Sequence, residues 1–220
     1  VIALGVFQMI RLLASAALAL ALVAAPARAD RTIAQTAPLS AELYLAGLEA
    51  RDPLLVLAAA RLRKSVALSE VARAVDKDMP EPEDIAAEAP LDWQEMLETA
   101  EAMAPEDAII TTLAEDIRAE SARGVKTGQL YSITAIRNGG TDTYPPMTYR
   151  GGEYADVYVE GTGQADLNLF VYDAQARLVC SDTDISAIAH CGWTPAQDAS
   201  FTVVVRNKGR GNSGYSLITN

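Results

Sequence analysis

The chain has 220 residues, of which half are apolar, and a formal net charge of −11 at pH 7. This length allows one large domain or two small ones, and the apolar fraction suffices for a packed core. Because an acidic surface repels phosphate backbones, the composition argues against nucleic acid as a partner.

The first 29 residues have the pattern of an export signal. Arg11 supplies a positive head, Leu12 to Val23 form an apolar run, and Ala27-Arg28-Ala29 places small residues where signal peptidase requires them. The run has 12 residues, fewer than the ~20 that a bilayer-spanning helix needs. We therefore expect a signal peptide over residues 1–29 and a periplasmic or secreted mature chain without a stable membrane span. An uncleaved anchor is the alternative.

Acidic residues are concentrated in the first half of the mature chain. Cleavage before Asp30 removes Arg11 and Arg28 and no acid, which leaves a net charge of −13. Residues 30–124 carry 20 acids against 9 bases, whereas residues 125–220 carry 9 against 7. We interpret the excess as a means of solubility in the cell envelope.

Residues 30–124 show the spacing of amphipathic helices. Ser40 and Asp52 are the expected caps of the first two helices, with Pro53 in the first turn of the second. Arg63, near the end of the second helix, suits the negative end of the helix dipole. Two further helices are expected at Leu91–Met103 and Glu106–Arg123, and Gly124 is expected to end the second of them. A charged linker is expected at Asp76–Glu88.

After Gly128 the apolar period changes to two, which is the spacing of half-buried strands. Tyr154–Glu160 and Asp166–Asp173 alternate clearly, with glycine-containing turns between the runs. Shorter runs of the same kind are Leu178–Cys180, Phe201–Val205 and Tyr215–Ile218. The pattern predicts an antiparallel β-sandwich over residues 128–220, so that the fold class is α+β, an N-terminal helical segment followed by the sandwich. The residues expected to face its core are Ala155, Val157, Val159, Leu167, Leu169 and Val171.

The chain contains two cysteines, Cys180 and Cys191. In an oxidising compartment, two cysteines this close together predict one disulfide. The alternative is a metal site that includes His190, the only histidine, but two thiols and one imidazole leave a zinc site one ligand short.

The β half contains an ordered set of motifs that resembles a bacterial family. The motifs are Tyr149-Arg150-Gly151-Gly152, Asp166 to Asp173, Cys180 to Asp184, Trp193-Thr194-Pro195, Phe201 to Gly209 and Tyr215 to Asn220. Together they resemble the pre-peptidase C-terminal domain family over residues 128–220. The resemblance implies a jelly-roll-like sandwich, found mainly on exported proteins and often attached to secreted proteases. Some relatives bind calcium or extracellular polymers.

No catalytic arrangement stands out in the sequence. Nucleophilic catalysis usually needs a histidine beside Ser or Cys, and His190 adjoins a cysteine that we expect to be oxidised. Gly161-Thr162-Gly163 lacks the lysine of a phosphate-binding loop, and the 29 acids single out no carboxylate pair. The segment before the sandwich reads as helical and not as a protease. We therefore expect that the protein is not an enzyme, with a hydrolase of unrecognised site as the remote alternative.

Calcium is the one cofactor hypothesis that the residues support. Asp166, Asp173, Asp182 and Asp184 are expected at strand ends and in one loop, and calcium binds several converging carboxylate oxygens. Against it, Asp is a common turn residue that accepts hydrogen bonds from nearby backbone. Asn168 also stands where many relatives of the resembling family carry an Asp.

Four aromatic residues are expected to share one outer face of the sandwich. Because side chains alternate along a strand, Tyr154, Tyr158, Phe170 and Tyr172 are expected to point away from the core. The pattern also predicts that the two strands that carry them are neighbours. Such a surface suits a protein or polysaccharide partner. The alternatives are cross-strand pairing of the rings and cover by the N-terminal helices, whose apolar stripes need a surface.

These expectations favour a non-enzymatic envelope protein that binds a protein or an extracellular polymer. The second class is a calcium-stabilised module for stability or secretion that has no ligand of its own. An exposed aromatic surface supports the first class, whereas an acidic pocket with converging oxygens supports the second.

Overall fold

The computed structural model describes residues 33–87, 89–120, 129–161 and 165–220. The predicted signal peptide, residues 1–29, and the predicted helix end at Gly124 lie outside the described residues. None of the helices in the described ranges is both long enough and apolar enough to cross a bilayer.

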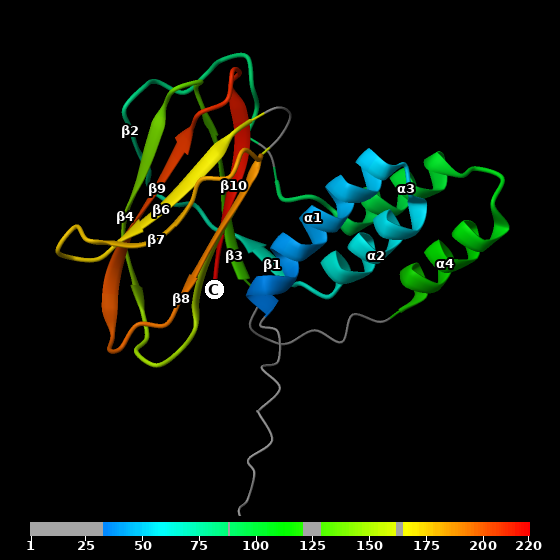
Figure 1. The fold of residues 1–220 in the computed structure, drawn as a ribbon, viewed down its shortest axis with the longest axis horizontal. Coiled ribbons are helices and arrows are strands. Elements are labelled where there is room, and N and C mark those ends of the chain that lie inside the picture. Colours follow the sequence, from blue (N-terminus) through cyan, green and yellow to red (C-terminus); the bar gives the residue numbers. More distant parts are fainter. Residues whose placement is uncertain (1–32, 88, 121–128, 162–164) are drawn as a thin grey trace, which may run out of the picture. The chain divides into compact units, whose positions relative to one another are not determined.

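Four helices precede the larger part of the sheet structure (Figure 1). They are α1 (Ile33–Ala50), α2 (Pro53–Lys64), α3 (Trp93–Met103) and α4 (Ala108–Ala119). The predicted start of α2 is confirmed, because a side-chain oxygen of Asp52 accepts a hydrogen bond of 2.9 Å from Leu54 N. Asp107 caps α4 in the same way, with 2.9 Å to Ile109 N.

The first helix begins earlier than its sequence suggests. It starts at Ile33, so the predicted cap, Ser40, lies inside α1 and is fully buried. The Ser40 hydroxyl donates a 2.7 Å hydrogen bond to Ala37 O and accepts one of 2.7 Å from Arg63 Nε. The hydroxyl of a serine inside a helix can donate a hydrogen bond to a backbone carbonyl one turn earlier. The local sequence around such a serine resembles that around a capping serine, so it does not tell the two positions apart.

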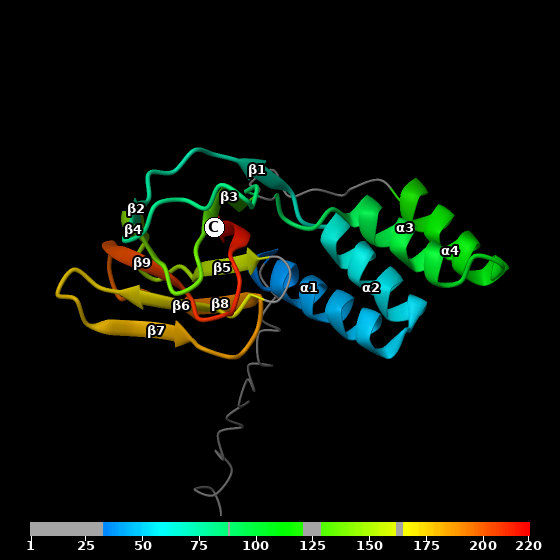
Figure 2. The ribbon, with the colours of Figure 1, turned by 90° about the horizontal axis from the view of Figure 1, so that it is seen from above.

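In the part of the chain that the structure describes, ten strands form two five-stranded sheets, and the predicted α+β class with an antiparallel sandwich is confirmed (Figures 1 and 2). Sheet A contains, in spatial order, β1 (Leu68–Glu70), β3 (Gln129–Ile136), β10 (Ser213–Thr219), β5 (Ala155–Gly161) and β8 (Ile188–Trp193). Sheet B contains β2 (Asp76–Lys77), β4 (Thr141–Tyr149), β9 (Ala199–Asn207), β6 (Leu167–Tyr172) and β7 (Leu178–Asp182). Neighbours pair antiparallel except β1 with β3, which are parallel.

The predicted inward residues form the core between the sheets. Val157 and Val159 of β5 and Leu167 and Leu169 of β6 are fully buried and belong to one apolar cluster. Ala155 and Val171 join the same cluster. The two runs that alternate most clearly in the sequence therefore face one another from opposite sheets, because β5 lies in sheet A and β6 in sheet B.

A segment for which the sequence pattern predicts no strand, and whose last residues begin the predicted linker at Asp76, closes one edge of the sandwich. We call residues 68–78 the strap: β1 is the edge strand of sheet A, β2 is the edge strand of sheet B, and the chain crosses between them. Val75 packs against the core, and Lys77 Nζ lies 2.7 Å from a carboxylate oxygen of buried Asp142. These strands have three and two residues, too few to show a period in the sequence.

The disulfide closes the opposite edge, and its prediction is confirmed. Cys180 of β7 and Cys191 of β8 are bonded, with 5.8 Å between their Cα atoms. These are the edge strands of sheets B and A. Both sulfur atoms are thus committed to a bond between the sheets, which excludes them as zinc ligands in this state.

Candidate functional site

The outer face of sheet A is covered by helical residues. α1 packs on β5 and β8, and Tyr158 of β5 is 1% exposed in a cluster with Ala37 and Ala41 of α1. Tyr158 therefore follows the alternative expectation, in which the N-terminal helices cover the aromatic residues. Its hydroxyl donates a 2.7 Å hydrogen bond to Glu160, whose carboxylate is paired with Arg63 at 2.7 Å.

Tyr154 also lies on this covered side. Its hydroxyl is within 3.4 Å of Gln35 Nε2 of α1, and its ring lies across Gly192 of β8. A Cβ atom at position 192 would lie 1.8 Å from the Tyr154 hydroxyl oxygen, so only glycine permits this approach. Tyr154 and Tyr158 are therefore part of the packing of α1 on sheet A.

The other two predicted aromatics lie on the outer face of sheet B. Phe170 and Tyr172 of β6 are half-buried and stacked, with ring centroids 6.5 Å apart. The guanidinium carbon of Arg206 lies 4.9 Å from the centre of the Phe170 ring. We call the surface formed by Phe170, Tyr172, Thr202 and Arg206 the open face. The name marks the contrast with sheet A, on which α1 makes its extensive contacts with the strands.

The predicted four-residue aromatic surface is therefore divided between the two sheets. The alternation within each strand is as expected, but β5 pairs with β10 and β8, whereas β6 pairs with β9 and β7. The two strands are consecutive along the chain, yet they lie in different sheets. A local period of two does not reveal which sheet a strand joins.

The four aspartates predicted to bind calcium do not come together as one site. Asp166 precedes β6 and Asp173 follows it, so a whole strand, on the order of 20 Å, separates them. Asp173 accepts hydrogen bonds from Arg177 N and Nε at 2.9 and 2.7 Å, which lower the pKa of its carboxyl. Within the described ranges, no group of three or more His, Cys, Asp or Glu side chains is arranged to hold a metal ion.

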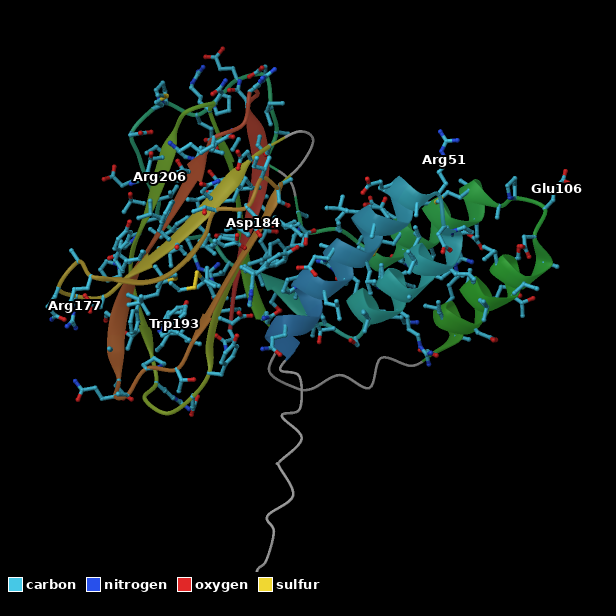
Figure 3. All side chains as sticks on the ribbon, in the orientation of Figure 1. Arg51, Glu106, Arg177, Asp184, Trp193 and Arg206 are labelled. Atoms are coloured by element: carbon cyan, nitrogen blue, oxygen red, sulfur yellow. A yellow bond between two sulfur atoms is a disulfide. The ribbon has the colours of Figure 1, made fainter. Side chains whose placement is uncertain are left out.

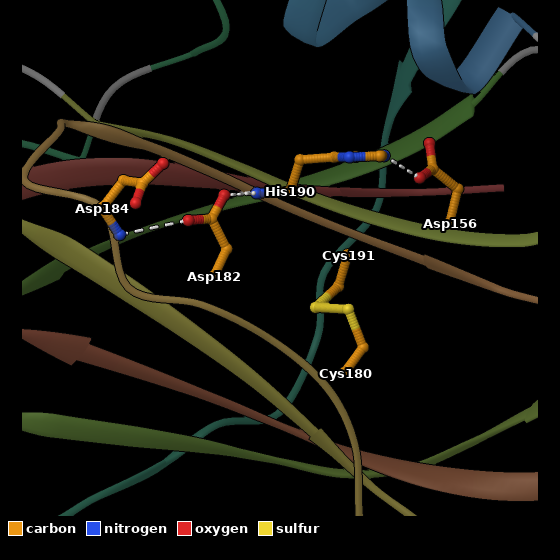
Figure 4. Close-up of a disulfide and its surroundings, with 6 residues drawn as sticks. All are labelled: Asp156, Cys180, Asp182, Asp184, His190 and Cys191. Carbon is orange, nitrogen blue, oxygen red and sulfur yellow. Dashed lines mark hydrogen bonds and ion pairs between the residues drawn. A yellow bond between two sulfur atoms is a disulfide. The ribbon is translucent and has the colours of Figure 1, made fainter.

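Asp182 and Asp184 lie near the disulfide (Figure 4). Asp182 accepts hydrogen bonds from Asp184 N at 3.2 Å and from His190 N at 2.8 Å, while the Asp184 residue is exposed. These contacts are those of a turn-forming aspartate. Calcium binding stays a prediction of the sequence.

His190 forms an ion pair on the covered side of sheet A (Figure 4). Its Nε2 bonds to Asp156, a residue that is 1% exposed. The hydrogen bond that His190 makes to the Asp156 carboxylate raises the pKa of His190 above 6.5, although desolvation lowers it, and the charges of Asp182 and Glu42 act to raise it as well. The side chain that bonds to His190 Nε2 is therefore a buried carboxylate, which holds the imidazole ring in place on this side of the sheet.

Replacing His190 with Gln is expected to change how stability depends on pH. Because the folded pKa of His190 is raised, this residue stabilises the fold fully below about 6.5, and the contribution is lost as pH rises through the folded pKa. The unsubstituted chain should therefore lose more stability than H190Q between pH 6 and 8.5. Urea unfolding at four pH values tests this, and parallel curves for the two proteins would contradict it.

A groove at one end of the sandwich was not expected from the sequence. It has a volume of about 610 Å³ and lies between the turn at residues 173–177 and the segment 193–201. Trp193 and Phe201 line it, with their ring centroids 5.1 Å apart in an edge-to-face arrangement. Figure 3 shows Trp193 and Arg177 at this part of the sandwich and Arg206 away from it on the sheet. Trp193 is one of the residues that carry the family resemblance, but no local pattern marks it as a groove residue.

Comparisons with known proteins show a distant likeness at the level of structure. No family model matches the chain, and no curated protein matches it significantly. Among solved structures, it is similar to the pre-peptidase C-terminal domain of a collagenase from Bacillus anthracis, with 6% identity and a TM-score of 0.31. That alignment covers 70% of this chain and 96% of the other.

A second similar structure contains the CBM22-1 and GH10 modules of an endo-1,4-beta-D-xylanase 10B from Clostridium thermocellum, complexed with xylohexaose. The identity is 8% and the TM-score 0.21, over 40% of this chain and 24% of the other.

Proposed function

We propose that this protein is an exported, non-catalytic module that binds a protein or polysaccharide partner through the open face. The observation that carries the proposal is the unequal cover of the two sheets. α1 covers β5 and β8 on the outer face of sheet A, whereas aromatic rings and a guanidinium lie half-buried on the outer face of sheet B.

The strand register supports a continuous binding surface. Phe170 lies opposite Val204, and Tyr172 lies opposite Thr202, so the side chains of β6 and β9 stand in adjacent rows. Aromatic and arginine side chains are the residues that contribute most to binding energy at interfaces. Stacking on Tyr172 and on Arg206 also holds the Phe170 ring in place, which reduces the entropy lost on binding.

Export is supported by the disulfide and by the signal-like first 29 residues. The motifs that resemble the pre-peptidase C-terminal domain family fit an accessory role on the cell surface or in the periplasm. We propose that residues 128–220 are a domain of this type. The calcium-stabilised role is the second prediction from the sequence, and a rise of the melting temperature on adding calcium to metal-free protein would support it.

Removing the aromatic pair is expected to abolish partner binding with the fold intact. F170A/Y172A should weaken binding by at least about 30-fold, the loss that corresponds to the 2 kcal/mol or more contributed by one interface hot spot. The matched control is I185S, which removes a 92% exposed apolar side chain outside the open face.

The measurement is site-specific photocrosslinking in intact cells from position 202, on the open face, and from position 109, on α4. Crosslinks from position 202 that persist in I185S and vanish in F170A/Y172A support the proposal. A partner captured equally from both positions, or retained by the double variant, would refute it.

A further inference from the structure

The floor of the end groove is a fixed aromatic platform. We call the end groove the hollow lined by Trp193, Phe201, Gln175, Arg177, Gln197 and Asp198. The Trp193 ring centroid lies 5.1 Å from that of Tyr149 and 5.1 Å from that of Phe201, both in edge-to-face contact. Trp193 is nonetheless half-exposed. Rings held on two sides in this way lose little freedom when a ligand stacks on them.

The rim of the end groove carries hydrogen-bonding groups that are already oriented. Arg177 Nε donates to Asp173 at 2.7 Å, and one Arg177 terminal nitrogen donates to Gln175 Oε1 at 3.3 Å. The Arg177 side chain is nevertheless 75% exposed, so further N–H groups face solvent. On the other side, Asp198 accepts a 2.8 Å hydrogen bond from Gly151 N, which fixes the loop that also carries Gln197.

This combination selects for a hydroxyl-rich ligand with apolar ring faces. The volume, about 610 Å³, lies within the range of sites for small organic molecules. The rim holds two carboxylates, of Asp173 and Asp198, against one guanidinium, and the chain has a net charge of −11. An anionic polymer is therefore repelled, whereas a neutral one is not.

We infer that the end groove binds a neutral glycan, with one sugar ring stacked on Trp193 and its hydroxyl groups bonded to Arg177 and Gln197. The inference rests on the proposed function and deepens it by naming the chemistry of the partner. Tyr172 of the open face directly precedes Asp173 of the groove, and Thr202 of the open face directly follows Phe201 of the groove along β9, so the two surfaces adjoin.

The test uses Trp193 as its own reporter. The chain has two tryptophans, so W93F leaves Trp193 as the single one. The full-length W93F protein is titrated with neutral hexasaccharides of glucose, xylose, mannose and N-acetylglucosamine. At least one is expected to change the Trp193 emission saturably and to protect it from acrylamide quenching. Calorimetry on the unsubstituted chain repeats the titration without the Trp93 substitution.

The rim residues provide the specific variant and its control. R177A/Q197A is expected to weaken the binding of that glycan about tenfold, because two hydrogen bonds of ordinary strength are lost. R210A, an exposed arginine in the loop at the opposite end of β9, should leave the affinity unchanged.

Two results would overturn the inference: no glycan alters Trp193 emission or gives heat at millimolar concentration, or R177A/Q197A binds as tightly as R210A. Failure of the proposed function is distinguishable from this. If F170A/Y172A loses the cellular crosslinks while every glycan leaves Trp193 unchanged, the open face stands and the glycan groove does not. If the glycan titrates Trp193 and the crosslinks survive in F170A/Y172A, the reverse holds.

Discussion

Replacing Arg63 with Met is expected to lower the free energy of unfolding by about 3–5 kcal/mol, the usual cost of breaking one partner of a buried ion pair. The side chains of Arg63 and Glu160 are 2% and 4% exposed, and their charged atoms are 2.7 Å apart. Without Arg63, the Glu160 carboxylate keeps, among the described residues, the hydrogen bonds from the Tyr158 hydroxyl and Leu91 N, but it has lost its cation while it stays buried. Urea unfolding followed by circular dichroism gives the difference.

The matched control lies two residues earlier on the same helix. Arg61 pairs with Glu120 at 2.7 Å, but these side chains are 65% and 43% exposed. R61M should therefore cost less than about 1 kcal/mol. In the double variant R63M/E160L, the unpaired buried charge is gone, so part of the lost stability should return. An equal cost for R63M and R61M would show that the Arg63 pair is not buried in solution.

This ion pair connects segments that are far apart in the sequence. Arg63 lies in the last turn of α2 and Glu160 in β5, and Leu91, whose backbone N–H donates to the same carboxylate, precedes α3. The sequence places Arg63 at a helix end, where a cation suits the dipole, and that interpretation explains its position but not its burial. Its partner lies 97 residues away.

The parts of the fold that could be predicted are those set by neighbouring residues. Asp52 caps α2 because its side chain reaches an amide two residues on. Val157 and Leu169 face the core because alternation along a strand follows from backbone geometry. The disulfide was predictable because Cys180 has only Cys191 available as a partner.

The candidate site could be predicted only in part, because it depends on which strands become neighbours. Phe170 and Tyr172 were correctly expected on an outer face, but their separation from Tyr154 and Tyr158 follows from the division of β5 and β6 between sheets. Likewise, Trp193 and Arg177 line one groove because two loops distant in sequence meet at the end of the sandwich. Nothing in the local pattern of either loop encodes that meeting.

The strap offers the second test with a large expected effect. K77M is expected to lower the free energy of unfolding by about 3 kcal/mol at pH 8, because it leaves the Asp142 carboxylate without its cation. The Lys77 and Asp142 side chains are 17% and 3% exposed, and Asp142 also accepts a 2.8 Å hydrogen bond from the Tyr215 hydroxyl. The exposed Lys208, changed to Met, is the control and should cost little.

The pH dependence separates loss of the ion pair from a general loss of packing. Burial raises the pKa of Asp142 even with Lys77 and Tyr215 acting to lower it, so removing Lys77 should raise it further. A carboxyl whose pKa is raised in the folded state favours folding at low pH and loses that contribution as pH rises through the folded pKa. The cost of K77M should therefore be smaller at pH 5 than at pH 8, and K77M/D142N should show no such difference. A cost that is the same at both pH values would mean that the strap stabilises the sandwich through Val75 and the backbone pairing alone, and that the Asp142 charge has no part in closing this edge.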